Sequence, residues 1–429
     1  MKRVLVVFST AWDARQLESC RAAWAPRFEV EYAKPSDDDC PWDYDVPGWI
    51  ERTAEAIRAR RADGRIDGVM SSSDYPGATA AGAVATRLGL PGTPPETLIR
   101  CSHKYYSRLA QREAAPEAVP DFHLVDPGRP LADAAAIRFP CFVKPVKGAF
   151  SIMARRVDSA EDLAAFLGRP AAREFVRDYV RIFNDLVARL TSLEVGGSWF
   201  LAEGLLQGDP VTVEGFAQEG EVGILGVVDS VLHPATGSFL RFDYPSQLPA
   251  AVQERMGVIA RRVMTHLGFR TGLFNIEMTW DARADRIWIV EVNPRLCGQF
   301  ADLYQKVDGT NGYEVGLALA AGETPALRHG QGRFRRASSF PLRTFEPVRV
   351  VRAPTAQDVS AAEALYPDTL VWVECETGWR LEDFDRFEDG FSARYGVINV
   401  GAPDRESLFS RRDEVRARLG IELAPLVGA

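Results

Sequence analysis

The sequence predicts an α/β fold that becomes α+β in part and is divided into several domains. Short apolar runs alternate with helical stretches over the first hundred residues, which is typical of a parallel sheet with crossover helices. From about residue 199 to 330, strand-like runs dominate instead. At roughly 150 residues a domain, 429 residues give about two to four domains, each with a core of its own.

The composition is that of an ordinary soluble globular protein, with 46% hydrophobic and 26% charged residues. The net charge of -8 argues against a nucleic-acid partner, because proteins that neutralise phosphates usually carry a basic surface. The six cysteines lie far apart and form no CxxC pair, so we expect reduced thiols and a cytoplasmic location. The first apolar run, Val4–Phe8, is too short for a signal peptide or a membrane span, and we expect no membrane partner.

Residues 1–100 are expected to form an open α/β domain. Three apolar runs read as its strands: Val4–Phe8, FEVEYA from Phe28, and IDGVM ending at Met70. A helical stretch near 49–60 separates the last two. An Ala-rich helix with a Gly- and Pro-rich exit places the domain boundary between about residues 91 and 101.

The next segment contains a helix near 103–115, short strands in FHLVD and FPCFVKP, and a long apolar periodicity. Apolar side chains recur at helical spacing from Phe175 to Leu193, which predicts one amphipathic helix over 171–195, ended by Gly196 and Gly197. A lid, a dimer element and plain packing all fit this helix, and packing is the favoured interpretation.

The stretch LFNIEMTWDARADRIWIVEVNPR predicts a β-hairpin around the polar turn DARADR. Alternate residues of a strand share a face, so Glu291 and Asn293 point the same way, and Glu277 on the partner strand can join them. Oxygen donors without a nearby His or Cys suit Mg²⁺. A lone Glu in a strand is more often solvated, but Glu291 lies within the apolar run IWIVEV, where an unpaired carboxylate would be costly.

Lysines near the strand FVKP are candidate phosphate ligands. Lys144 precedes a proline and is held extended at the strand end, and the following loop, with Gly148 and Ser151, offers backbone N–H groups. Lys147 is an alternative phosphate contact or a solvated loop charge. Lys104, on the preceding helix, is by itself more typical of a surface residue.

The segment WFLAEGLLQGDPVTVEGF reads as two strands of a hairpin with a break between them. Its backbone could bind adenine, with Leu205 on an apolar wall. Further along, LHPATGSFLRFDYPSQLP is expected to line an acceptor site, with His233, Arg241 and Asp243 as polar candidates. Arg241 suits a substrate carboxylate, since Arg offers bidentate geometry, but a surface salt bridge fits equally well.

Five elements, taken in order, resemble the ATP-grasp superfamily: Lys104, VKP with Lys144, AEGLLQG with Glu203, IEM with Glu277, and EVNPR. The resemblance covers about residues 1–330, and the rest is similar to the extra domain of the L-amino-acid ligase and carnosine-synthase-like branch. It implies an N-terminal open α/β domain (1–100), a lid-like central domain with a helical insertion (101–198), a metal- and nucleotide-binding domain (199–330) and a C-terminal α+β subdomain (331–429). One departure is that the phosphate loop has one glycine where relatives commonly have two or more.

The resemblance also implies ligands. ATP would be bound through its phosphates by Lys104, Lys144 and the Gly148–Ser151 loop. The backbone at Glu203 and Leu205 would hold the adenine, and Glu214 is a further nucleotide contact. Glu277, Glu291 and Asn293 match the ligands of two Mg²⁺ ions, for which Mn²⁺ could substitute. Arg295, with Lys144, would stabilise charge on the reacting carboxylate and the transferred phosphoryl group.

The implied activity is that of an ATP-dependent carboxylate–amine ligase, which forms an amide or peptide bond through an acyl phosphate and releases ADP and phosphate. Its partners would be a small-molecule carboxylate and an amine, one of them an amino acid, and homodimers are common in the family. Two alternatives stay open. The first is another ATP-grasp reaction, either carboxylation or phosphotransfer. Carboxylation is disfavoured by the lack of a fused biotin-carrier segment in this sequence, unless the carrier is a separate protein. A non-catalytic nucleotide-binding subunit would not need both metal carboxylates, Asn293 and Arg295.

Overall fold

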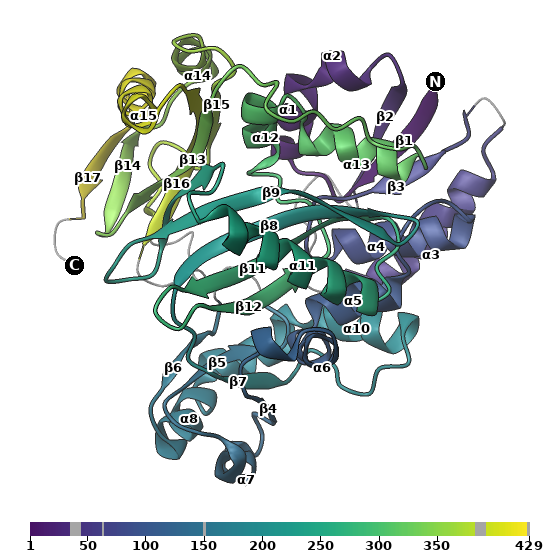
Figure 1. The fold of residues 1–429 in the computed structure, drawn as a ribbon, viewed down its shortest axis with the longest axis vertical. Helices are drawn as coiled ribbons and strands as arrows, with labels where there is room; N and C mark the ends of the chain where they lie inside the picture. The colour runs from purple at the N-terminus through teal and green to yellow at the C-terminus, as the bar shows by residue number, and fades with distance from the viewer. Residues whose placement is uncertain (35–43, 62–63, 149–151, 382–391, 427–429) are drawn as a thin grey trace. The chain divides into compact units, whose positions relative to one another are not determined.

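The computed structural model describes residues 1–34, 44–61, 64–148, 152–381 and 392–426, and its contacts divide the chain into two compact units (Figure 1). The first unit contains Met1–Leu225, Leu248–Cys297 and Tyr313–Pro325. The second contains Gly226–Gln247, Gly298–Gly312 and Ala326–Ala429. The chain passes from the first to the second within strand β9 (Glu221–Leu232). The expected division into four domains stays a prediction.

The first unit begins with the parallel sheet that the alternating pattern predicts. Its strands are ordered β2 (Phe28–Ala33), β1 (Lys2–Val7) and β3 (Gly68–Met70), and both pairings are parallel. The helices of this part are α1 (Ala11–Ser19), α2 (Arg21–Trp24), α3 (Val46–Arg58) and α4 (Gly77–Leu88). Because parallel strands direct their carboxyl ends to one edge, the loops after β1 and β3 meet at the same edge of the sheet.

The single helix expected over 171–195 is wrong. The structure has α9 (Pro170–Glu174), a π-helical turn η4 (Phe175–Tyr179) and α10 (Arg181–Leu190), which ends before Gly196. The Tyr75 hydroxyl explains the irregularity, because it accepts a hydrogen bond from the Phe183 N–H (2.8 Å) and donates one to the Tyr179 carbonyl (3.0 Å). A hydroxyl thus lies between two groups that a regular helix would join directly.

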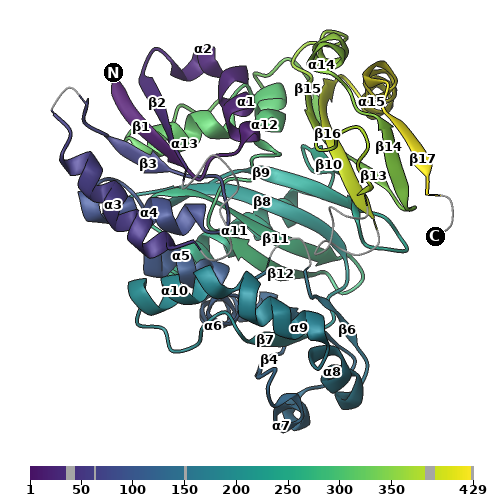
Figure 2. The same ribbon diagram turned by 180° about the vertical axis from the view of Figure 1, so that it is seen from behind.

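Helix α10 packs into the core of the parallel sheet. Ile182, Phe183, Leu186 and Val187 belong to the same buried cluster as Leu5, Val7 and the apolar side chains of α3 and α4. In both views α10 lies beside α5 (Figures 1 and 2). Packing therefore accounts for the apolar face of this helix.

A four-stranded antiparallel sheet follows in the first unit. Its order is β4 (Phe122–Val125), β7 (Phe200–Gly204), β5 (Cys141–Pro145) and β6 (Arg155–Val157). Its helices are α5 (Pro95–Ser102), α6 (Lys104–Ala114), η2 (Pro116–Ala118), α7 (Pro130–Asp133), η3 (Ala134–Ala136) and α8 (Ala160–Leu167). Val143, Val157, Leu163 and Phe200 are fully buried and form its core.

The expected hairpin around Gly208 is also wrong. Strand β7 belongs to the four-stranded sheet, whereas β8 (Asp209–Gln218) pairs with β11 (Gly272–Asp281) in another sheet. Gly208 has a φ of +121°, and a Cβ there would lie 2.3 Å from the carbonyl oxygen of Trp280. The glycine thus allows a turn and a close backbone approach that redirect the chain between sheets.

The hairpin predicted around DARADR is confirmed. β11 pairs antiparallel with β12 (Arg286–Asn293), so the order in the first unit is β12, β11 and β8. Glu277 lies opposite Glu291 and Asn275 opposite Asn293 in the register, with a bulge between Glu277 and Met278. Helix α11 (Ala250–His266) packs against β8, β11 and α6, and α13 (Gly312–Ala320) belongs to this unit from Tyr313 onward.

The second unit has a sheet ordered β9, β10 (Phe239–Tyr244), β13 (Arg336–Thr344), β16 (Ala393–Ala402) and β15 (Leu370–Val373), and a separate pair of β14 (Val348–Arg352) and β17 (Glu422–Pro425). Its helices are α12 (Ala301–Asp308), α14 (Ala356–Glu363) and α15 (Arg405–Leu419). In the part of the chain that the structure describes, no helix combines the length and the apolar character needed to cross a bilayer.

Candidate functional site

The predicted metal residues lie together on the β11–β12 hairpin of the first unit. The pairing places Glu277 directly opposite Glu291, and Asn293 follows two residues later on the same face of β12. The side-chain nitrogen Nδ2 of Asn293 donates to Asn275 Oδ1 (3.1 Å) and to Glu291 Oε1 (3.4 Å). Since both N–H groups of this amide are engaged, its oxygen is the atom left to act as a ligand.

The two glutamates have unequal electrostatic surroundings. Burial, with the charge of Glu291 opposite, raises the pKa of Glu277 to about 8. Burial acts the same way on Glu291, but Lys104 and Lys144 outweigh it and hold the pKa of Glu291 below its ordinary value. A divalent cation between the carboxylates would allow both to ionise, so the two carboxylates and the amide oxygen fit a hard cation such as Mg²⁺.

Helix α6 presents one polar face to this hairpin. Lys104 Nζ lies 3.0 Å from Glu291 Oε2 and donates to the Gly148 carbonyl (2.9 Å). One turn later, Arg108 is almost completely buried, and it donates to Glu203 Oε1 (2.5 Å) and to the Val290 carbonyl (2.9 Å). The sequence places these cations four residues apart, which puts them on the same side of a helix.

Lys144, at the end of β5, joins the same cluster. Its ammonium lies 2.7 Å from Glu203 Oε2 and donates to the Val290 carbonyl (3.2 Å). Burial lowers the pKa of Lys144, although Glu203 opposes this effect. Burial would raise the pKa of Glu203, but Arg108 and Lys144 instead lower it to about 2. Glu203 is thus an ionised anchor for two cations, and the adenine contact expected of its backbone stays a proposal.

Two further cations surround Asp74, which follows β3. Lys147 Nζ lies 2.8 Å from Asp74 Oδ2, and Arg295 Nε lies 3.9 Å from Asp74 Oδ1. Burial would raise the pKa of Asp74, but Lys147 and then Arg295 hold it well below its usual range. Lys147, with 3% of its side chain exposed, is therefore no solvated loop charge.

The remaining predicted residues are distributed over both units. Ser151 lies outside the described residues, and Leu205 is exposed. Glu214 on β8 accepts from the Cys297 N–H (2.8 Å). His233, Arg241 and Asp243 lie in the second unit.

In the second unit, Arg241 forms an ion pair with Asp243 (2.8 Å) in which both side chains are largely buried. Asp243 also accepts from the Ser338 hydroxyl (2.7 Å), and the ring of His233 lies 4.5 Å from that of Phe345. Arg241 thus forms a salt bridge, one of the two interpretations of its sequence, with 15% of its side chain exposed. A substrate role for the three residues stays a proposal.

Sequence reasoning missed Arg108 and Asp74. Arg108 is four residues after Lys104, so the spacing of the helix could have indicated it. Asp74 follows the serines of SSSDYP at the carboxyl end of a parallel strand, where ligand-binding loops of α/β sheets gather. Its partners Lys147 and Arg295 are far away in the sequence, and no local pattern indicates them.

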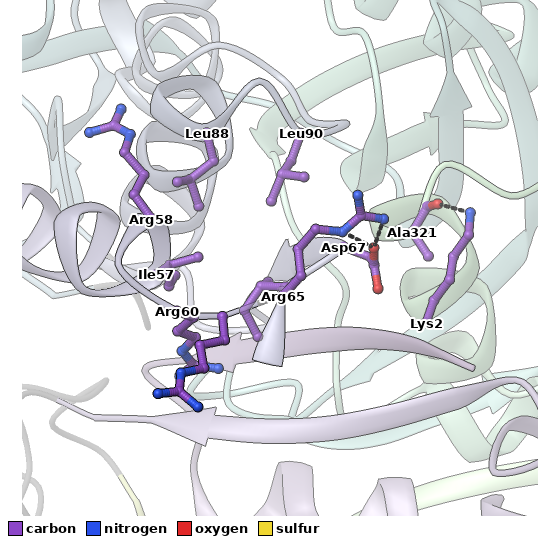
Figure 3. A pocket seen from close by; sticks show the side chains of 11 residues that line it. Lys2, Ile57, Arg58, Arg60, Arg65, Asp67, Leu88, Leu90 and Ala321 are labelled. Carbon is purple, nitrogen blue, oxygen red and sulfur yellow. Dashed lines mark hydrogen bonds and ion pairs between the residues drawn. The ribbon is translucent and has the colours of Figure 1, made fainter. Parts of the chain in front are cut away.

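A surface cavity of about 520 Å³ lies at the amino ends of β1 and β3 (Figure 3). Its floor is apolar, with Ile57, Ile66, Leu88 and Leu90, and its rim is basic. Figure 3 shows Arg65 bonded to Asp67 and Lys2 bonded to the Ala321 carbonyl. None of the predicted site residues lines this cavity, which lies at the other end of the strands from Asp74.

Comparison with known proteins identifies the segment that carries the hairpin and Lys144. Residues 137–302 match the model of the ATP-grasp domain. This segment is an ATP-grasp domain. A curated relative, the formate-dependent phosphoribosylglycinamide formyltransferase of Methylococcus capsulatus, is 32% identical over 170 residues, which cover 38% of this chain. The match spans 37% of the length of that relative.

Solved structures extend the likeness to the whole chain at the level of the fold. The L-amino acid ligase of Bacillus licheniformis aligns over 99% of both chains, with a TM-score of 0.72 and 18% identity. The biotin carboxylase domain of the 2-oxoglutarate carboxylase of Hydrogenobacter thermophilus, solved with MgADP, ADP and bicarbonate, has a TM-score of 0.64 and 15% identity. It covers 99% of this chain and 90% of the other. The chain therefore has the ATP-grasp fold, as its sequence predicts.

Proposed function

We propose that the protein is an ATP-dependent carboxylate–amine ligase, which forms an amide or peptide bond through an acyl phosphate and releases ADP and phosphate. One observation carries the proposal: the ATP-grasp domain brings a paired-carboxylate hairpin against fixed lysines, with Lys104 Nζ 3.0 Å from Glu291. A site that only held nucleotide would not need two facing carboxylates, of which burial and then the charge of Glu291 raise the pKa of Glu277 to about 8.

In this proposal the cations act on the phosphates of ATP. Lys104 and Lys144 approach the hairpin from α6 and β5, so their ammonium groups can neutralise a polyanion that a carboxylate must attack. Glu203 keeps Lys144 charged despite its burial. Glu277, Glu291 and Asn293 would hold Mg²⁺, which would supply charge neutralisation on the phosphate oxygens. Two ions, and Mn²⁺ as a substitute, belong to this proposal.

Arg295 is proposed to stabilise the charge on the reacting carboxylate and the transferred phosphoryl group. Its guanidinium makes no hydrogen bond within the described part of the chain, and its ion-pair partner there is the Asp74 carboxylate, at 3.9 Å. Five N–H donors are thus available for a ligand. Gly148, Ser151, Glu203, Leu205 and Glu214 are proposed nucleotide contacts, and His233, Arg241 and Asp243 are proposed contacts of the acceptor.

The proposal is tested by trapping the acyl phosphate. The protein is incubated with ATP, Mg²⁺, hydroxylamine and pooled organic and amino acids, and ADP, AMP and hydroxamate are followed together. Formate and bicarbonate belong in the pool, since formate appears in the name of the curated relative and bicarbonate in that of a structural neighbour. Acid-dependent ADP and hydroxamate are expected. AMP instead of ADP would indicate adenylation and contradict the mechanism.

A Glu291→Gln variant is the matched control for this assay. It keeps the shape of the side chain but removes one proposed metal charge and the partner of Lys104. Hydroxamate formation should fall by at least about 10²-fold, the scale of losing one fixed group at a transition state. If the Mg²⁺ concentration changes hydroxamate formation by the wild type but not by the variant, the assignment of Glu291 as a metal ligand is supported. Equal turnover of the two proteins would exclude Glu291 as a metal ligand.

A further inference from the structure

Lys147 has a partner that comes from outside the ATP-grasp domain. Its ammonium lies 2.8 Å from Asp74 and above the rings of Tyr75 (5.3 Å) and Phe183 (5.6 Å). A buried ammonium is costly unless a counter-charge is near, and aromatic faces supply only part of that stabilisation. Asp74 is therefore the group that allows a lysine with 3% of its side chain exposed to stay charged.

The second oxygen of Asp74 has a different surrounding. Asp74 Oδ1 is buried and, among the described residues, accepts no hydrogen bond. Arg295 Nε is 3.9 Å away, which is within ion-pair range but too long for a hydrogen bond. The carboxylate thus attracts the guanidinium without occupying its donors.

The loop that carries Asp74 is itself fixed. Tyr75 follows directly, and its hydroxyl is bonded to both the Phe183 N–H and the Tyr179 carbonyl. Its ring stacks on that of Tyr179 at 5.7 Å. Because the neighbouring residue is held at two backbone groups, the position of Asp74 is defined by the core that α10 and the parallel sheet share.

We propose that Asp74 is a positioning residue that anchors Lys147 and orients the Arg295 guanidinium for the reacting carboxylate, an inference that rests on the proposed function of Arg295. One carboxylate serves two cations, through a direct contact with Lys147 and through space with Arg295. The N-terminal parallel sheet thereby contributes to the reaction centre of the ATP-grasp domain, although Asp74 lies outside the matched segment 137–302. Asp74 acts through these cations and does not touch the substrate.

The kinetic test compares Asp74→Asn with the same change at the other end of β3, Asp67→Asn. Asp74→Asn should lower kcat by at least about tenfold while the KM and Kd of ATP change less than about twofold, because an interaction of the transition state is lost. Asp74→Glu should recover part of kcat, and Asp67→Asn should match the wild type. An unchanged kcat for Asp74→Asn would overturn the proposal. If kcat is unchanged and the KM of the acid or the amine rises, Asp74 is a substrate ligand and not a positioning residue.

A second test does not depend on turnover. Phenylglyoxal modifies guanidinium groups that are free to turn towards it, and the Asp74 carboxylate holds the Arg295 guanidinium at 3.9 Å, so removing that carboxylate should speed labelling. Peptide mass spectrometry should show Arg295 of Asp74→Asn labelled at least about threefold faster than in the wild type and in Asp67→Asn. Equal rates would overturn the proposal.

This labelling also separates the two proposals. If the wild type forms no hydroxamate, the proposed function fails, and the Arg295 labelling rate still decides whether Asp74 controls the guanidinium. If Asp74→Asn does not fold, Asp74→Asn/Lys147→Met takes its place, because it removes both members of the pair and leaves Arg295 without its ion-pair partner. The same threefold increase is expected for that variant, and its absence contradicts the proposal.

Discussion

The two ends of β3 carry the same kind of ion pair in opposite surroundings. At the amino end, Asp67 lies 2.7 Å from Arg65, whose side chain is 77% exposed. At the carboxyl end, Asp74 lies 2.8 Å from Lys147, whose side chain is 3% exposed. The distances are nearly equal, so distance does not distinguish them. Water screens the first pair, whereas the buried ammonium of Lys147 depends on Asp74 as its direct counter-charge.

The two ends of β3 also differ in whether their polar groups already have hydrogen-bond partners within the protein. The amino end carries the cavity of Figure 3, where arginines already bond to neighbouring acids and carbonyls. The carboxyl end carries Asp74, with one oxygen that accepts no hydrogen bond in the described chain, beside an arginine whose donors are free there. Groups left unsatisfied by the protein are the ones that a ligand can satisfy.

The largest effect is expected from Lys147→Met. The change leaves the Asp74 carboxylate, whose Oδ1 is buried, without its direct partner, and breaking a buried pair in this way typically costs about 3–5 kcal/mol of unfolding free energy. Urea denaturation should therefore show a midpoint far below that of the wild type with an unchanged m value. A loss under about 1 kcal/mol would mean that water reaches Asp74 and that the two ends of β3 differ less than their exposures indicate.

Arg295→Ala should affect catalysis rather than folding. Removing one well-placed donor to a developing charge costs roughly 10²–10³ in turnover, or about 2.7–4 kcal/mol. ATP should still bind, because Lys104 and Lys144 remain. Steady-state kinetics with ATP binding measured by calorimetry checks both statements. Near-normal turnover would remove Arg295 from the mechanism, and lost ATP binding would make it a nucleotide contact.

The residues that the sequence revealed and those that it hid differ in a physical way. The hairpin of Glu277 and Glu291 was predictable because strand alternation and a polar turn are local signals, and Glu291 was conspicuous inside an apolar run. The ion pairs of Asp74 were not predictable, because its partners come from the loop after β5 and from the segment after β12, and such pairs form only in the folded chain.

The wrong predictions have the same origin. The periodicity from Phe175 to Leu193 indicated helix correctly, but the Tyr75 hydroxyl that interrupts it comes from another part of the chain. The two strands around Gly208 were also correctly placed, and only their partners were wrong. A local pattern thus indicated the element in both cases, while tertiary contacts decided its continuity and pairing.

A third prediction extends the comparison to a titratable group. His103 precedes α6 and is fully buried, and its Nε2–H donates to the Gly196 carbonyl (3.1 Å) while Nδ1 has no partner among the described residues. Burial lowers the pKa of His103 from 6.5 to about 4. The unfolded chain therefore takes up a proton between these values that the folded chain does not.

The contribution of neutral His103 to the unfolding free energy is fully present above pH 6.5 and is lost as the pH falls towards 4. Between pH 7 and 5 the loss should be about 2 kcal/mol, at 1.36 kcal/mol for each unit. Urea denaturation of the wild type and of His103→Gln at pH 7 and pH 5 measures this loss. The variant should lose less unfolding free energy on acidification. The exposed His266, paired with Glu113, provides the control variant His266→Gln. If the wild type and His103→Gln lose the same unfolding free energy between pH 7 and pH 5, other groups cause the acid sensitivity.

The smallest effect is expected from Arg65→Met at the amino end of β3. The change removes the cation from Asp67, as Lys147→Met does from Asp74, but 77% of the Arg65 side chain is exposed, so water already screens this pair. Asp67 also keeps the hydrogen bond that it accepts from the Arg3 N–H (2.9 Å). The unfolding free energy should thus fall by less than about 1 kcal/mol, and 0.5 M salt should abolish most of that difference. A loss as large as that of Lys147→Met would show that position in the sheet, and not burial, makes these pairs matter.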